Sequence, residues 1–405
     1  MSDVLVVGGG FAGVWCAAGV VRTARHAGAD ATQIRVTLVD AGDDIVIRPR
    51  LYETDPERMR VPLDRILGPI GVRRVAATVT GIDTAERRVT AVRRDGTAVE
   101  MTYDRLVLAA GSRLVPPPIP GAEHLFDVDT LPTAAVLHAH LQRTAAGGDD
   151  GPLTAVVVGA GFTGIETATE LATRLRVLAG DRATRLVLVE RAPVVGPELG
   201  AGPRPEILRA LDTAGVEVRL QTSVTSVDET TALLSDGTVV PTRTVVWTGG
   251  MQASPLTEQV PGKRDQLGRL LVDEHLEVVD VPGVYAAGDT AAAVAEPGHV
   301  VMQSCQHAVP QGKFAGYNVA ADLLGLPRVP FSPDPYVTCL DLGAHGAVLT
   351  TGWDREVAQT GAAAKDLKRS INAEWIYPPL DDADMIINHA DHRTTWPTAT
   401  VGQST

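Results

Sequence analysis

The feature that most constrains this chain is a glycine-rich segment that occurs twice, each time directly after a short apolar stretch. The first copy, GGGFAG, spans residues 8–13 and follows an apolar stretch that ends at residue 7. The second copy, GAGFTG, spans residues 159–164 and follows residues 155–158. Residues typical of a helix come after both copies. The order of strand, glycine turn and helix, found twice, predicts two βα units of the kind from which parallel sheets are built.

Three glycines in each segment have distinct roles in such a turn. Gly8 permits the tight reversal of the chain, Gly10 lets a diphosphate approach the backbone, and Gly13 lets the helix pack against the strand. The equivalent positions in the second segment are Gly159, Gly161 and Gly164. The free N–H groups and the positive end of the helix dipole then face the phosphates. Each segment therefore predicts a dinucleotide site.

An acidic residue ends the next apolar stretch in both copies. Residues 34–39 lead to Asp40, and residues 186–189 lead to Glu190. A carboxylate at this position accepts hydrogen bonds from the ribose hydroxyls of adenosine. Glu190 would repel a 2′-phosphate, which favours NADH over NADPH, although the adjacent Arg191 could turn toward such a phosphate.

Two further apolar stretches end in small residues. Residues 281–289 predict a short buried strand followed by Gly288 and Asp289, and residues 103–112 predict a strand that reaches Gly111. The Asp289 carboxylate can reach the ribitol hydroxyls of a flavin, and Gly288 lets the backbone approach the pyrophosphate. Residues 281–289 therefore predict a second contact with a flavin beside the first glycine segment, and on this basis we assign FAD to the first of the two folds.

Bulk properties exclude several classes of protein. A chain of 405 residues predicts two or three domains, and 44% apolar with 21% charged residues suits an α/β protein. A net charge of -13 without any basic run argues against nucleic acid as a partner. Three widely spaced cysteines predict a reducing, cytoplasmic location and no metal site. No apolar segment is long enough to span a membrane.

Taken together, these motifs resemble the pyridine nucleotide-disulfide oxidoreductase superfamily over roughly residues 1–325. The resemblance implies an α/β fold with two Rossmann-like, three-layer domains, the NAD(P)H domain being inserted into the FAD domain. The implied boundaries are 1–115 and 271–327 for the FAD domain and 116–270 for the NAD(P)H domain. A small C-terminal α/β segment, 328–405, would cover the flavin face, and its tail after residue 380 is expected to be flexible.

Three short segments resemble the type II NADH:quinone oxidoreductases within that superfamily. Residues 47–53 and 247–250 are similar to their Pro-Leu-Leu-Tyr-type and Trp-Thr-Ala-Gly segments. Residues 305–311, CQHAVPQ, correspond to the quinone-site segment, although Cys305 and Pro310 depart from it. The disulfide-reducing branches need a cysteine pair that this chain lacks. The resemblance therefore implies a quinone or quinone-like aromatic as the electron acceptor.

Pro310 predicts the first turn of a helix that runs to about Leu324 and aims its N–H groups at the flavin. Just before it, His307 is either a proton donor to the acceptor or a packing residue. Glu166 and Glu170 share one helix face after the second glycine segment, and Glu166 is the cofactor-side acid, placed to order the nicotinamide or relay protons.

From the motifs and the resemblance we expect two sets of site residues. The expected catalytic residues are Glu166, Gln306, Gln311 and His307. The expected cofactor-binding residues are Gly8, Gly10, Phe11, Ala12, Gly13, Asp40, Ala41, Arg48, Val79, Ala110, Gly111, Gly288, Asp289, Gln306, His307, Ala308, Gly159, Gly161, Gly164, Glu190 and Gly249.

The C-terminal part leaves several alternatives open. Apolar Leu367, Ile371 and Trp375 recur at helical spacing, which suits packing against the flavin domain or, less well, a peripheral position at the inner face of a membrane. A homodimer is possible. The functional alternatives are a soluble NADH-dependent reductase for a ferredoxin or a small aromatic metabolite, and an NAD(H)- and flavin-binding redox sensor.

Overall fold

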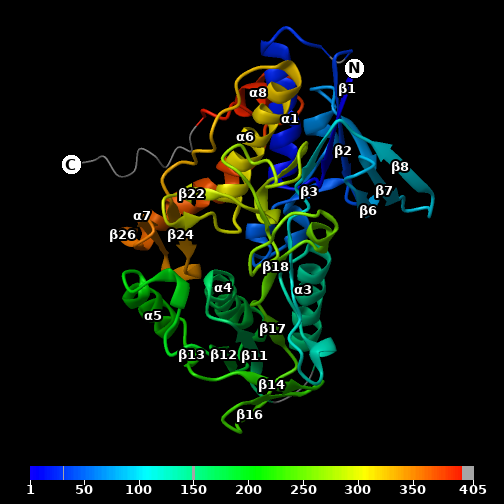
Figure 1. The fold of residues 1–405 in the computed structure, drawn as a ribbon. Coiled ribbons are helices and arrows are strands. Elements are labelled where there is room, and N and C mark those ends of the chain that lie inside the picture. Colours follow the sequence, from blue (N-terminus) through cyan, green and yellow to red (C-terminus); the bar gives the residue numbers. More distant parts are fainter. Residues whose placement is uncertain (31, 148–150, 395–405) are drawn as a thin grey trace.

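The computed structural model describes residues 1–30, 32–147 and 151–394, and in these residues two parallel sheets form the framework (Figure 1). The first has the strand order β20-β9-β1-β2-β5 and the second the order β13-β12-β11-β17. The strands of the first sheet are β1 (Ser2–Val7), β2 (Ile34–Asp40), β5 (Arg73–Ala76), β9 (Arg105–Leu108) and β20 (Val284–Ala286). Those of the second are β11 (Leu153–Val158), β12 (Thr184–Val189), β13 (Val216–Arg219) and β17 (Val245–Trp247). The predicted α/β class with two Rossmann-like folds is confirmed.

One edge strand of the first sheet comes much later in the chain than the other strands. β20 follows the whole second sheet in sequence, yet it pairs with β9, with Val284 opposite Leu106. The chain leaves and re-enters the first domain beside an antiparallel pair, β10 (Ser112–Leu114) and β18 (Met251–Ala253). The second sheet is therefore inserted into the first domain.

Smaller antiparallel sheets extend both domains. Beside the first sheet lie β6 (Thr78–Asp83), β7 (Arg88–Val92) and β8 (Ala98–Thr102), and beside the second lie β14 (Val224–Val227), β15 (Thr231–Leu234) and β16 (Val239–Pro241). Two further antiparallel pairs are β3 (Asp44–Val46) with β4 (Arg60–Pro62) and β22 (Val294–Glu296) with β23 (His299–Val300). A short parallel pair is formed by β19 (Leu270–Leu271) and β21 (Ala291–Ala292).

The helices that pack on the sheets complete both domains. They are α1 (Phe11–His26) and α2 (Asp64–Leu67) in the first, α3 (Leu131–Ala146), α4 (Phe162–Ala179) and α5 (Arg204–Thr213) in the second, and α6 (Cys305–Leu324) after the chain has returned. None of the helices among the described residues is both long and apolar enough to cross a membrane.

Helices α1 and α6 lie directly against each other in the core of the first domain. A Cβ atom at Gly312 would lie 2.3 Å from the Ala12 carbonyl oxygen, so glycine is required for this contact. Helix α6 begins at Cys305, five residues before Pro310, so the prediction that Pro310 starts the helix was wrong. Pro310 lies within the helix, where it removes one backbone donor.

The C-terminal segment forms a third unit between the two domains (Figure 1). It consists of β24 (Val337–Asp341), β25 (Ala347–Thr351) and β26 (Glu356–Thr360), then α7 (Gly361–Ser370) with a π-helical turn (Ile371–Trp375), and finally α8 (Ala383–His389). Helix α8 was not expected, because the acidic residues after 380 predicted a flexible tail. Its Ile386 and Ile387 are buried in the core beside α1, and Asp391 pairs with Arg22 at 2.6 Å. Residues 395–405 of the expected tail lie outside the described residues.

Candidate functional site

The two glycine turns have nearly the same backbone geometry. Gly8 and Gly159 both have positive φ, at 112° and 102°. A Cβ on Gly13 would lie 1.9 Å from the Gly8 carbonyl oxygen, and a Cβ on Gly164 would lie 1.8 Å from the Gly159 oxygen. Only glycine fits at these positions. In both folds the turn leaves the N-terminus of the following helix facing the space where a phosphate group would bind.

The acidic residue after each second strand occupies the same place in both folds. The Gly9 N–H donates to Asp40 Oδ2 at 2.7 Å, and the Ala160 N–H donates to Glu190 Oε2 at 2.7 Å. The remaining carboxylate oxygens accept from the N–H groups of Gly42 and Ala192. Both carboxylates are thus fixed beside the turn, where the ribose of a bound dinucleotide would lie.

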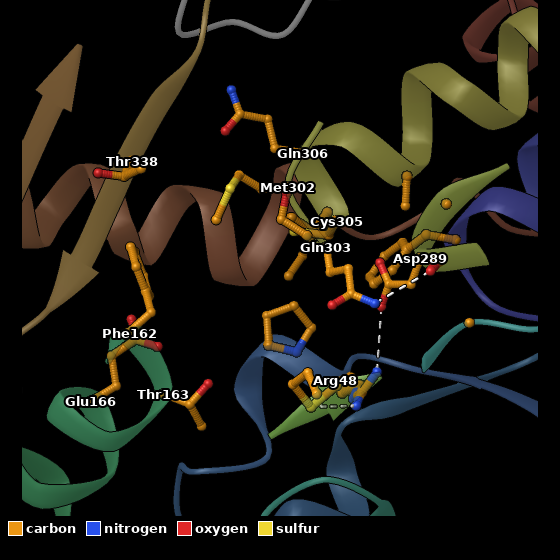
Figure 2. Close-up of a pocket in the computed structure, with 18 of the residues that line it drawn as sticks. Arg48, Phe162, Thr163, Glu166, Asp289, Met302, Gln303, Cys305, Gln306 and Thr338 are labelled. Carbon is orange, nitrogen blue, oxygen red and sulfur yellow. Dashed lines mark hydrogen bonds and ion pairs between the residues drawn. The ribbon is translucent and has the colours of Figure 1, made fainter. Parts of the chain in front are cut away.

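A cavity of about 470 Å³ lies where the two folds face each other, and residues of the C-terminal segment also line it (Figure 2). Helix α4 contributes Glu166, Phe162 and Thr163 at one end of the view, and Arg48 and Asp289 lie at the other. The expected site residues that line it are Gly10, Phe11, Ala12, Arg48, Gly111, Glu166, Gly288, Asp289, Gln306 and Ala308.

The other expected site residues do not line this cavity. They are Gly8, Gly13, Asp40, Ala41, Val79, Ala110, Gly159, Gly161, Gly164, Glu190, Gly249, His307 and Gln311. Several of them shape the turns and strand ends behind the lining residues, and their binding roles remain predictions.

Residues of the first fold fit a flavin dinucleotide. A Cβ on Gly10 would meet no atom within 4 Å, so the space above this lining residue is open where a diphosphate would approach. The Ser112 hydroxyl donates to Asp289 Oδ2 at 2.5 Å, and Arg48 lies 3.6 Å from the same oxygen. Burial raises the pKa of Asp289, and the hydrogen bond from Ser112 acts in the opposite direction. Asp289 thus faces the cavity as an acceptor for hydroxyl groups.

A buried ion pair faces the cavity from the other side. Lys368 of α7 donates to Glu166 Oε1 at 2.9 Å and to the Cys339 carbonyl oxygen at 3.0 Å, and the Asp341 N–H donates to the same Glu166 oxygen at 3.0 Å. Burial raises the pKa of the Glu166 carboxyl, and the Lys368 ammonium acts against it. A glutamate of this kind can exchange a proton closer to neutral pH than a solvated one.

The ion pair continues into a network that joins all three parts of the chain. Asp341 on β24 forms an ion pair with Lys365 and accepts from the Tyr52 hydroxyl at 3.2 Å. Sequence reasoning gave neither Lys368 nor Asp341 a role. Lys368 lies 202 positions after Glu166, and no local pattern pairs residues so far apart.

Comparison with known proteins places this arrangement in a family. A family model described as pyridine nucleotide-disulphide oxidoreductase matches residues 2–312. The chain belongs to this family. It is therefore an oxidoreductase that uses a pyridine nucleotide, and the family implies binding of FAD and NAD(H).

Two relatives match most of the length of the chain. It is 48% identical to an NADH dehydrogenase-like protein of Mycobacterium tuberculosis over 94% of this chain and 96% of the relative. It is 26% identical to a type II NADH:quinone oxidoreductase of Staphylococcus saprophyticus over 92% and 95%. Among solved structures, NDH2 of Plasmodium falciparum in complex with NADH shares the fold, with a TM-score of 0.76 over 96% of each chain at 12% identity. The resemblance inferred from the sequence is confirmed.

The family's quinone-site pattern includes both Gln306 and Gln311, but the structure places their side chains in different surroundings. Gln306 lines the cavity, and its amide can donate to the Val337 carbonyl oxygen at 2.6 Å. Gln311 is buried in α6, where its Oε1 accepts from the Gly288 N–H at 3.2 Å. Residues five apart in an α-helix point about 140° away from each other, so the two side chains leave α6 in different directions. Gln311 therefore supports the Gly288 backbone rather than facing an acceptor.

His307 also lies behind the cavity wall. Its Nδ1 accepts from the Met302 N–H at 3.1 Å, and its ring stacks on Tyr336 at 5.2 Å. Burial lowers the pKa of His307 to about 4, so the ring is neutral at physiological pH. Of the two roles considered for it, the geometry favours packing over proton donation.

This burial predicts a pH effect on stability. Between pH 6.5 and 4, His307 is protonated in the unfolded chain but not in the folded one. The free energy of unfolding therefore decreases by about 3 kcal/mol as the pH falls through this window. We expect His307→Gln to flatten the fall in Tm over this range while leaving the pH profile of turnover between 6 and 8 unchanged. An altered turnover profile would show that His307 takes part in proton transfer.

Cys305 and Cys339 both line the cavity, while Cys16 is buried in the first domain. Burial raises the pKa of each of the two cavity thiols to about 11. They are therefore neutral thiols, which suits apolar packing and not a nucleophilic role.

Proposed function

We propose that this enzyme oxidises NADH through FAD bound in the first fold and passes the electrons to a quinone. The observation that supports this most directly is the shared cavity, because residues of both glycine turns or their helices line it together. A flavin and a nicotinamide that enter from the two folds would meet there. When bound, FAD accepts hydride from the nicotinamide and releases electrons to the acceptor.

The preference for NADH rests on Glu190. Its two carboxylate oxygens accept from the backbone N–H groups of Ala160 and Ala192, and its side chain is buried. A carboxylate fixed in this way beside the ribose would repel the 2′-phosphate of NADPH. Arg191 is exposed.

The proposal that a quinone is the acceptor rests on the part of the cavity wall that neither glycine turn forms. The apolar lining residues of this wall come from the C-terminal segment and the stretch just before α6, namely Met302, Val337, Ile371, Trp375 and Ile376. Such a wall suits a flat aromatic acceptor. A relative over nearly the whole chain is named a type II NADH:quinone oxidoreductase.

Glu166 is the group we propose for proton transfer. Reduction of a quinone to its hydroquinone consumes the hydride of NADH and one proton from solvent. Glu166 lines the cavity with a raised pKa, while Lys368 and the Asp341 N–H orient its Oε1. It can carry a proton to the acceptor.

Rapid mixing separates the proposed function from its alternatives, with NADH or NADPH as the donor and then, for the anaerobically reduced enzyme, a soluble quinone or a ferredoxin as the acceptor. We expect fast reoxidation by a soluble quinone, slow reoxidation by a ferredoxin, and faster initial reduction by NADH than by NADPH. Fast reoxidation by ferredoxin alone would contradict the quinone assignment. Slow reoxidation by every acceptor would favour a redox sensor.

A further inference from the structure

Arg355 is a buried cation on the wall of the cavity. It lies in the turn between β25 and β26, is 5% exposed and has a φ of 59°. Its Nη1 has no hydrogen-bond partner among the described residues, and its Nη2 makes a long contact of 3.5 Å to the Glu198 carbonyl oxygen. A buried guanidinium group with an unpaired donor is costly unless an anion completes it.

An aromatic stack fixes the position of this guanidinium. Its Cζ lies 4.6 Å from the centre of the Tyr336 ring, Tyr336 stacks on Trp353 at 4.3 Å, and Trp353 stacks on His299 at 4.5 Å. Within the described part of the chain, no carboxylate forms an ion pair with Arg355. The Tyr336 side chain supplies a weak attraction through its ring and a neutral hydroxyl group, but no negative charge.

The carboxylate of Glu198, whose carbonyl oxygen Arg355 contacts, lies at the second glycine turn. Its Oε1 would be only 2.4 Å from a Cβ on Gly161, which caps the N-terminus of α4. The first turn offers a contrast, because the matching space at Gly10 is open. A helix N-terminus attracts an anion, so Glu198 occupies the place where the second fold would receive a diphosphate. Its side chain is exposed and can move away.

We propose that Arg355 binds the diphosphate of the pyridine dinucleotide and that the Glu198 carboxylate leaves the turn when this ligand enters. The inference rests on the proposed function, since it assigns the dinucleotide to the second fold. It adds a nucleotide-binding residue from the C-terminal segment, which lies outside both glycine turns. In this arrangement the phosphates lie between the N–H groups of α4 and a guanidinium group.

Titration calorimetry with ADP-ribose, which contains the diphosphate but no nicotinamide, tests this on the FAD-containing protein. We expect Arg355→Met to weaken binding roughly tenfold to a hundredfold, as loss of a charge-assisted hydrogen bond does. Arg355→Lys should recover part of the affinity. Glu198→Gln should bind about fivefold more tightly, because a like charge near the phosphates is removed. The exposed Arg369, paired with Asp366, provides the control Arg369→Met, which should leave affinity unchanged.

Unchanged affinity in Arg355→Met and in Glu198→Gln would overturn the inference while leaving the proposed function intact. A lower Tm without a change in affinity would likewise overturn it, because Arg355 would then act only in packing. If Arg355→Met does not fold, Arg355→Lys and Glu198→Gln decide the question, since their opposite changes in affinity are both required. A wild-type enzyme that binds no ADP-ribose would contradict the inference and the proposed function together.

Discussion

Gly10→Val is expected to give a folded protein that has lost FAD, whereas Gly161→Val is expected to keep FAD and lose NADH. Gly10 has φ −79° and ψ −170°, and Gly161 has −78° and −169°, a conformation that valine adopts without strain. At Gly10 the added side chain enters the open space in front of α1, and at Gly161 it enters the space now filled by Glu198. Each added side chain should weaken its dinucleotide roughly a hundredfold or more.

The measurement is the FAD content of each purified variant together with its affinity for ADP-ribose. Gly151→Val serves as the control, because Gly151 is exposed and a Cβ there meets nothing within 4 Å. It should keep both ligands. If Gly10→Val retained a full complement of FAD, or if Gly161→Val lost FAD, the assignment of the two folds would be wrong.

The second large effect concerns the buried ion pair of Glu166 and Lys368. Lys368→Met leaves a buried carboxylate without its counter-charge, which typically costs about 3–5 kcal/mol. For a chain of this length, such a loss lowers Tm by roughly 5 °C if the whole chain unfolds together. The double variant Glu166→Gln with Lys368→Met should recover part of this loss, since neither charge remains.

Thermal unfolding of the FAD-containing single and double variants measures this coupling. Glu170→Gln is the matched control, one turn further along α4, where the carboxylate makes only a 3.3 Å contact to Thr54. It should change Tm little. If the losses in the two single variants simply added in the double variant, Glu166 and Lys368 would not be energetically coupled.

Much of the framework could be predicted from the sequence because its signals are local. Each glycine turn, the strand before it and the acid after it lie within one βα unit, and the backbone conformation at Gly8 and Gly13 excludes other residues. Asp289 was likewise marked by a short strand and a glycine. All of these features can be recognised within short stretches of the sequence.

The parts of the site that could not be predicted depend on distant contacts. Lys368, Asp341 and Arg355 come from the C-terminal segment, which has no motif of its own. Helix α8 was not predicted because the acidic residues after position 380 suggested a flexible tail. The structure shows that Ile386 and Ile387 in this segment pack beside α1. Gln311 and His307 were placed at the acceptor by a pattern that gives their order in α6 but not the direction of each side chain.

Anaerobic titration of the FAD-containing enzyme with NADH, followed by the visible absorbance of the flavin, tests the central claim most directly. The two folds facing one cavity predict that one equivalent of NADH reduces the flavin fully. The result that would contradict this account is NADH that binds to the enzyme while the flavin stays oxidised.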